Sequence, residues 1–260
     1  MVSLPTNVTA ALLSSVRQYL TKIEWLNWAE DTVLGDYTDY AISGSISMDA
    51  SRDARRNFAA TFNNASGLFV PNGALTNMGA KIRLYRGIVT STGPYLWKRG
   101  IFVLSDPEAN QSGVEKTVSL NGVDKWALHN GDLGGTLTET TIIPAGTNVA
   151  DGIRAVGEDG GETKFAFDTC TTVTPYEISK EPGATRADLW KELALIPSWE
   201  IFYDIDGYLR FRPIVDPLNK QVSIYLNVAG EPEVEEEPGG GGEITGKTYF
   251  IGPGMAMKMK

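Results

Sequence analysis

The chain has 260 residues, 42% of them hydrophobic and 10% aromatic, so it carries enough apolar side chain for a packed core and is not disordered as a whole. Its formal net charge of −9 argues against a protein that grips nucleic acid, because such proteins neutralise phosphates with clustered Lys and Arg. Cys170 is the only cysteine, which excludes an internal disulfide and a zinc site built from cysteines.

The first twenty residues lack a basic segment, and their apolar run is too short for a signal peptide or a membrane span. We therefore expect synthesis in the cytoplasm and no membrane insertion. Leu12, Val16 and Leu20 recur at helical spacing, which predicts an amphipathic helix within 6–20. This helix or an extended arm is expected to form an N-terminal segment over 1–21.

Between residues 22 and 134 the hydrophobic period changes to two, which is typical of strands with one buried face. Turn-rich breaks separate these runs, and no long helical pattern intervenes. The sequence therefore predicts an antiparallel sheet that closes into a β-barrel or a sandwich, as one domain over 22–134 of a mainly β (α+β overall) fold. The alternating apolar positions are Ile42, Ile46, Met48, Phe58, Ala60, Phe62, Ile82 and Leu84.

Residues 135–212 mix helical and strand patterns and are predicted to form a small α+β domain. Thr147 is placed to cap a short helix. Thr185, with Asp188 three residues later, predicts a capping box at the start of a second helix, and Pro197 ends it.

One or two returning strands are expected over 213–230, followed by an acidic Gly/Pro linker and tail over 231–260. Five glutamates lie between Glu231 and Pro238, and four glycines follow them, so this stretch has little to bury. The letters of a phosphate-loop motif occur at 241–248, but an acidic linker precedes them where a buried strand should stand. An accidental match is favoured.

No catalytic, cofactor-binding or metal site stands out, so the chain is interpreted as a protein that is not an enzyme and needs no cofactor. Asp204 and Asp206 resemble part of a calcium loop, but its last ligand position falls on Pro213, so a hairpin turn with Gly207 at positive φ is favoured. His129 is the only histidine and has no nucleophile pattern around it. We expect it at the surface or at its boundary.

Three arginines, Arg52, Arg55 and Arg56, cluster between two predicted strands. Guanidinium groups bind carboxylates in a bidentate manner, so these side chains are candidates for a subunit interface or for ion pairs with the chain's own Asp49 and Asp53. A solvated loop is the alternative.

Four segments in order carry a resemblance: Gly44 to Phe58 with its Arg-Arg turn, Lys-Ile-Arg-Leu-Tyr-Arg-Gly at 81–87, Gly-Ile-Phe-Val-Leu at 100–104, and 118–124. Together they resemble minor tail proteins of tailed bacteriophages, of the tail-tip or baseplate hub type, over most of residues 40–212.

The resemblance implies a tube-like barrel followed by an α+β insertion, assembled as a homo-oligomeric ring with a trimer favoured. Such a protein joins the tail tube to other tail-tip proteins and lets DNA pass without holding it. It is made in the host cytoplasm and ends in the virion, and no enzymatic activity is implied.

Two alternatives stay open at the level of sequence. A tail-associated cell-wall hydrolase would need two facing carboxylates in a cleft. A carbohydrate-binding module would need exposed aromatic side chains, such as Trp97 or Trp126, along a groove.

Overall fold

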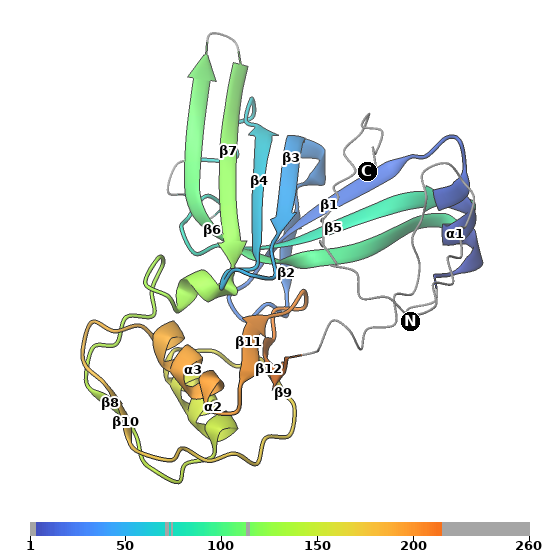
Figure 1. The fold of residues 1–260 in the computed structure, drawn as a ribbon. Helices are drawn as coiled ribbons and strands as arrows, with labels where there is room; N and C mark the ends of the chain where they lie inside the picture. The colour runs from blue at the N-terminus through green and yellow to red at the C-terminus, as the bar shows by residue number, and fades with distance from the viewer. Residues whose placement is uncertain (1–3, 71–72, 74, 113–114, 215–260) are drawn as a thin grey trace, which may run out of the picture.

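The structure is a computed structural model that describes residues 4–70, 73, 75–112 and 115–214. Its main feature is a seven-stranded antiparallel sheet with the strand order β2-β1-β5-β6-β7-β4-β3, and a small α+β region lies below it in Figure 1. The mainly β fold predicted from the sequence is therefore confirmed. The strands are β1 (Tyr19–Leu26), β2 (Val33–Asp36), β3 (Ala41–Met48), β4 (Arg56–Asn63), β5 (Lys81–Thr90), β6 (Gly93–Ser112) and β7 (Glu115–Asp124).

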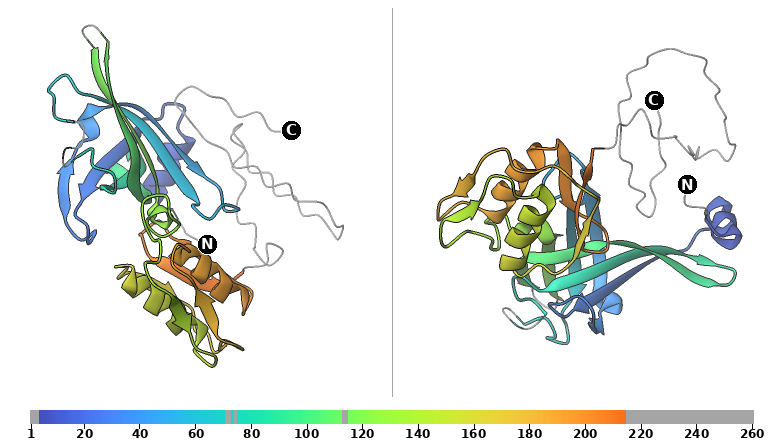
Figure 2. Two further views of the ribbon diagram at one scale, coloured as in Figure 1. Left: turned by 90° about the vertical axis from the view of Figure 1, so that its left-hand side faces the viewer. Right: turned by 90° about the horizontal axis from the view of Figure 1, so that it is seen from below.

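The sheet is strongly bent, and its long strands leave the body in two directions. In Figure 1, β1 and β5 run sideways towards α1 (Thr6–Leu13), while the β6–β7 hairpin extends upward. The view from below shows the same sideways arm (Figure 2). Among the described residues, pairing ends at β2 on one side and at β3 on the other, so closure of the predicted barrel stays a prediction.

The core of the sheet follows the predicted alternation. Phe58 and Phe62 of β4 are buried, while Ala59 between them is exposed. Phe62 also packs on Trp25 and Phe69, with ring centroids 5.7 and 5.2 Å apart. The predicted one-sided burial of this strand is confirmed.

The expectation for the strand at 41–48 was partly wrong. Ile42 was predicted to face the core but is 61% exposed, and Ile46 and Met48 are only partly buried. The reason is position, because β3 pairs with β4 on one side and is the last strand of the sheet in the described part of the chain.

The N-terminal helix is shorter than predicted. α1 ends at Leu13, Ser14 is extended, and Tyr19 already begins β1. Leu20 belongs to the sheet because it pairs with Gly87 of β5 rather than lying on a helical face. Val8 is fully buried, so the helix is held against the end of the arm.

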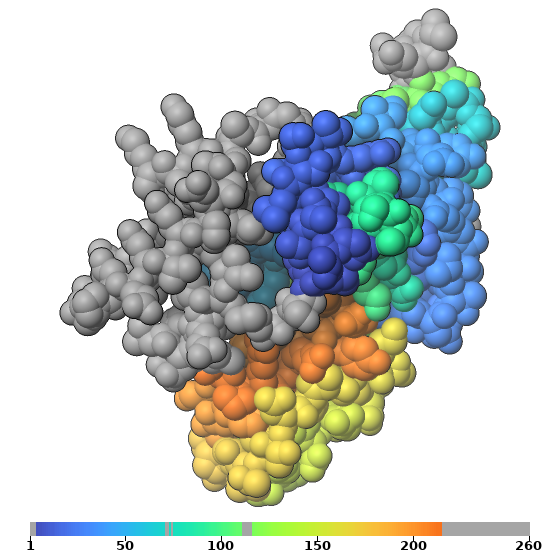
Figure 3. Space-filling view, turned by 90° about the vertical axis from the view of Figure 1, so that its right-hand side faces the viewer, coloured from blue at the N-terminus to red at the C-terminus, as the bar shows by residue number. Residues whose placement is uncertain are grey.

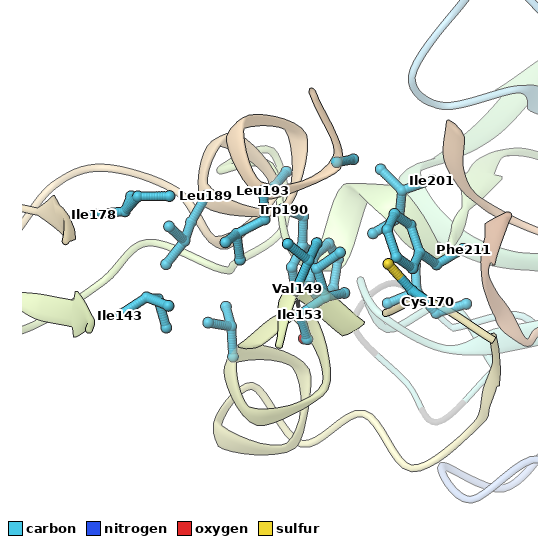
Figure 4. Packing of buried hydrophobic residues seen from close by; sticks show 14 of the residues in the cluster. Ile143, Val149, Ile153, Cys170, Ile178, Leu189, Trp190, Leu193, Ile201 and Phe211 are labelled. Atoms are coloured by element: carbon cyan, nitrogen blue, oxygen red, sulfur yellow. Dashed lines mark hydrogen bonds between the residues drawn. The ribbon is translucent and has the colours of Figure 1, made fainter. Parts of the chain in front are cut away.

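The α+β region has helices α2 (Val149–Asp159) and α3 (Arg186–Leu195), and Figure 4 shows their apolar side chains interleaved. Its strands are β8 (Thr141–Ile143), β9 (Phe165–Phe167), β10 (Ile178–Lys180), β11 (Trp199–Tyr203) and β12 (Leu209–Pro213). β9, β12 and β11 form a three-stranded sheet. Two 3-10 turns, η1 (Thr38–Tyr40) and η2 (Lys125–Leu128), complete the described elements.

The predicted cap of α3 is correct, and the predicted cap of α2 is wrong. The Thr185 hydroxyl accepts a hydrogen bond from the Asp188 amide at 3.1 Å, as predicted. At α2, however, Asn148 and not Thr147 is the cap, because the Asn148 side chain accepts from the Ala150 amide at 2.9 Å. The Thr147 hydroxyl instead donates to the Pro144 carbonyl at 2.8 Å.

The domain boundaries at 21, 134, 212 and 230 stay predictions. Trp126 lies before residue 134 yet packs in the core of the α+β region, so the two cores share a border at η2. Most of the predicted 213–230 strands and all of the 231–260 tail lie outside the described residues, as do the phosphate-loop letters at 241–248.

Candidate functional site

Charged side chains meet between the sheet and the α+β region at a junction centred on Glu30. This residue lies in the turn between β1 and β2 and is 3% exposed. Its carboxylate pairs with Lys81 of β5 at 2.7 Å and with Lys125 of η2 at 3.0 Å. Lys164, which precedes β9, reaches the same carboxylate at 3.0 Å. Three ammonium groups from three parts of the chain therefore converge on one buried carboxylate.

Lys125 joins the two sides of this junction. Its ammonium group lies 2.7 Å from the Glu162 carboxylate and donates to the Gly207 carbonyl at 2.9 Å. The Tyr203 hydroxyl donates to Glu162 at 2.8 Å. Gly207 also has to be glycine, because a Cβ there would lie 2.7 Å from a Glu30 oxygen and its φ is +81°.

The protonation states of the junction follow from burial and charge. Burial alone would raise the pKa of Glu162, but the charge and hydrogen bond of Lys125 outweigh it, so the pKa lies below the usual value. Burial lowers the pKa of Lys81, and the Glu30 carboxylate opposes that effect. Burial also raises the pKa of Tyr203 well above its usual value. Charge-assisted hydrogen bonds therefore hold the junction together.

A cavity of about 260 Å³ borders the junction, between Trp28 on the sheet side and residues 160–164 on the other. The charged groups along its wall, including Lys81 and Glu162, already form the ion pairs described above. This pairing favours a structural role for the junction, which fixes the α+β region against the sheet.

His129 lies in the wall of the same cavity and was placed wrongly by the sequence. It is 3% exposed, not at the surface, and its ring lies 4.6 Å from Trp190 and 6.1 Å from Tyr203. Burial lowers its pKa to about 4, so the imidazole is neutral at pH 7. No local pattern indicates this burial, because the contacting rings come from distant elements.

Asp124 carries a buried carboxyl group whose pKa is raised. Burial raises its pKa to about 6, although the backbone amides of Arg55, Arg56 and Trp126 donate to it. These bonds tie β7 to β4 and start η2, so the carboxylate serves the fold. The geometry thus lends no support to the hydrolase alternative, which needs two carboxylates facing an open cleft.

The three arginines proposed for an interface occupy different environments. Arg55 pairs with Glu200 of β11 at 2.9 Å, and buried Arg56 donates to the Tyr203 carbonyl. Arg52 is exposed and pairs with Asp49 at 3.2 Å. The ion pair with the chain's own Asp49 was one of the predicted options, whereas a subunit contact of these residues stays a prediction.

The two tryptophans named for the carbohydrate-binding alternative do not line a common groove. Trp126 is 1% exposed and packs on Trp190. Trp97 is half-buried and packs edge-on against Tyr95, with ring centroids 5.0 Å apart. A sugar platform built on both is therefore not present.

In the described ranges, no group of three or more His, Cys, Asp and Glu side chains is arranged to hold a metal ion. None of the helices in that part of the chain is long and apolar enough to cross a membrane.

Comparison with known proteins gives a match in structure only. No family model and no curated protein matches the chain. It is similar to a solved tail protein from Neisseria meningitidis MC58, with a TM-score of 0.51 and 13% identity over 74% of this chain and 50% of that one. It is also similar to the 43 kDa tail protein of prophage MuSo2 from Shewanella oneidensis, with a TM-score of 0.50 and 12% identity over 75% and 53%.

At this identity the likeness establishes only the fold, which the chain shares with these two tail proteins. The resemblance found in the sequence is confirmed to this extent. The chain spans about half the length of the two tail proteins.

Sequence reasoning missed the residues of the junction. Lys81 stands at the start of a strand, and Lys125 and Glu162 stand near turns, where charged residues are usually solvated. Only the fold brings them together, and no local spacing marks them.

The ion pairs predict a sharp difference between two lysines that both bridge the sheet and the α+β region. We expect Lys125→Met to lower the free energy of unfolding by about 3–5 kcal/mol, because it leaves Glu30 and Glu162 without their shared cation. The matched variant Lys98→Met removes a pair with Asp206 that is 44% and 41% exposed, and it should cost about 1 kcal/mol or less. Urea unfolding of both variants measures this, and equal losses would contradict a central role of Lys125.

The buried histidine predicts a pH dependence with a defined sign. The pKa of His129 falls from 6.5 to about 4 on folding, so the unfolded chain takes up the proton first and stability is lost as pH falls between these values. From pH 7 to pH 5 the loss should be about 2 kcal/mol, and His129→Phe should remove it. The measurement is the difference between the two proteins in urea unfolding, which cancels the opposite contribution of Asp124. A difference that does not change with pH would refute the assignment.

Proposed function

We propose that the chain is a structural subunit of a phage tail tip or baseplate hub, which joins the tail tube to distal tail proteins through ring-forming contacts. The observation that carries the proposal is a bent sheet whose pairing ends at β2 and β3 among the described residues, in a fold shared with two solved tail proteins. An open edge presents unpaired N–H and C=O groups that can pair with another chain.

The edge strand β3 lacks the usual protection against pairing. Its sequence Ala-Ile-Ser-Gly-Ser-Ile-Ser-Met contains no charged residue and no proline, which are the residues that keep an edge from pairing. Ile42 on this strand is 61% exposed. Such an edge supports a built-in contact with a second chain.

The other edge, β2, differs in sequence and length from β3. Val33 and Leu34 there are 45% and 62% exposed. Contacts between two different edges are heterologous, and heterologous contacts close into rings when the rotation allows it. This arrangement supports a ring of identical chains, for which a trimer is the favoured number.

The acidic chain suits a ring through which DNA passes without being held, since its net charge of −9 repels phosphates. Other tail-tube and tail-tip proteins are the expected partners, the virion is the expected location, and a non-enzymatic role follows from the same proposal.

The function is tested by immunogold electron microscopy. Antibody raised against the purified chain should label the tail tip of phage particles from a lysate in which the chain is made. Label along the tail shaft or the head, or chain found only outside the particles, would overturn the proposal.

The edge contact is tested by a charge placed on β3. Ile42→Lys should shift the purified chain from a ring to a monomer in mass photometry, because a buried lysine in the contact would lack a partner. Ile142→Lys is the matched control, since Ile142 is 51% exposed on the α+β region away from both edges. Rings that persist with Ile42→Lys, or that are lost with both variants, would argue against β3 as the contact.

A further inference from the structure

The sideways arm carries a basic and aromatic strip between the core of the sheet and α1, which buries Ile88 further along the same side. Arg86 of β5 lies opposite Thr21 of β1 and Trp97 of β6. Side chains alternate along a strand, so Arg86 is on the same side of the sheet as the core residue Leu84, but beyond the end of the core. We call this surface the arm face. It consists of Tyr19, Thr21, Arg86, Tyr95, Trp97 and Arg99.

The arm face is ordered by contacts among its own side chains. The Arg86 guanidinium lies 5.4 Å from the Tyr19 ring centre and donates to the Thr21 hydroxyl at 3.0 Å. Tyr95 and Trp97 pack edge to face. The five larger side chains of the arm face are all partly exposed, so its rings and guanidinium groups are accessible together. The space-filling view looks onto the tip of the arm, where α1 (dark blue) lies beside the turn between β5 and β6 (green) (Figure 3).

The basic side chains on one side of the arm form ion pairs with carboxylates, and those on the arm face do not. Away from the arm face, Lys22 pairs with Glu24 at 2.6 Å and Lys98 pairs with Asp206 at 2.6 Å. On the arm face, Arg86 and Arg99 form no ion pair with any carboxylate of the described ranges. Burial lowers the pKa of Arg99, and the nearby charge of Arg86 lowers it further. Two neighbouring guanidinium groups without an anion have hydrogen-bond donors available for a carboxylate ligand.

We propose that the arm face is the docking site for an acidic segment of the chain's own C-terminal region, residues 231–237. This segment reads Glu-Pro-Glu-Val-Glu-Glu-Glu and carries five carboxylates in seven residues. Its carboxylates match the two guanidinium groups of Arg86 and Arg99, and its proline and valine match the rings of Tyr95 and Trp97.

The length of the chain after β12 is sufficient for this contact. Lys98 pairs with Asp206 on the side of the arm opposite the arm face, and the last described residue, Ile214, lies eight residues after Asp206 in the chain. The 17 residues from 214 to 231 (231 − 214) span up to about 56 Å when extended.

Tethering also favours the chain's own segment over a free partner. Attachment through the intervening residues gives the segment an effective concentration on the order of 1 mM, so a dissociation constant of about 0.1 mM is enough to fill the site about ten to one. Nucleic acid fits less well, because the chain as a whole carries a net charge of −9.

The test uses a labelled peptide of residues 229–240 and the full chain with Glu231, Glu233, Glu235, Glu236 and Glu237 all changed to Gln. In fluorescence anisotropy the peptide should bind this Gln-tail chain about tenfold more tightly than the native chain, whose own segment competes. Adding Arg86→Gln and Arg99→Gln to the Gln-tail chain should weaken peptide binding at least tenfold. Adding Arg52→Gln, an exposed arginine on another part of the sheet, should leave it unchanged. Thermal unfolding of each variant checks that the arm is folded, and Arg86→Lys, which keeps the charge, should restore part of the binding.

Four results would overturn the proposal. The first is equal peptide affinity for the native and Gln-tail chains, and the second is binding that is insensitive to Arg86→Gln and Arg99→Gln. The third is a labelled thymidine 20-mer that binds the native chain and is lost with the same two changes, which would assign the arm face to nucleic acid. Competition that appears only at concentrations where chains associate would assign it to the segment of a second copy and refute docking within one chain.

Discussion

The buried carboxylate of Glu30 is the constraint on which the arrangement of the molecule depends. Taking one carboxylate and three ammonium groups out of water is costly, and the cost is offset only when every charge has a partner at hydrogen-bonding distance. Lys81, Lys125 and Lys164 meet this condition from three separate parts of the chain. A small rotation of the α+β region would break several of these pairs at once. The junction therefore defines one orientation, which an apolar contact of equal area would specify less strictly.

A single orientation matters for a protein whose proposed work is assembly. Contacts between subunits lose affinity when the partners must first be ordered, so a preformed body leaves more of the contact energy for binding. β1, β5 and η2 all contribute to the junction or flank it, and the same β1 carries the edge strand β2. The α+β region thus stands in a fixed relation to at least one open edge of the sheet.

The sequence predicted those features whose cause is local. Alternation around Phe62 specifies a buried strand, and Thr185 caps α3 through an atom three residues away. Sequence patterns failed where the cause is tertiary. Ile42 alternates like a core residue but lies on an edge, and Leu20 fits a helical spacing but pairs in a sheet. The junction could not be predicted from the sequence for the same reason, because no spacing relates Glu30 to partners 51 to 134 residues away.

The arginines beside β4 show what residue type alone can predict about a contact. A cluster of guanidinium groups correctly indicates that carboxylates and carbonyls gather nearby, but it does not say to which part of the molecule they belong. Arg55 meets Glu200 from the α+β region of the same chain, so these groups reinforce the junction from the side of β11. Arg86 presents the opposite case, with its ring and hydroxyl contacts in place and its ion pair missing from the described residues. Arg55, whose charge is balanced by Glu200, supports the fold, whereas Arg86 is held in place without a carboxylate and keeps donors available for a ligand.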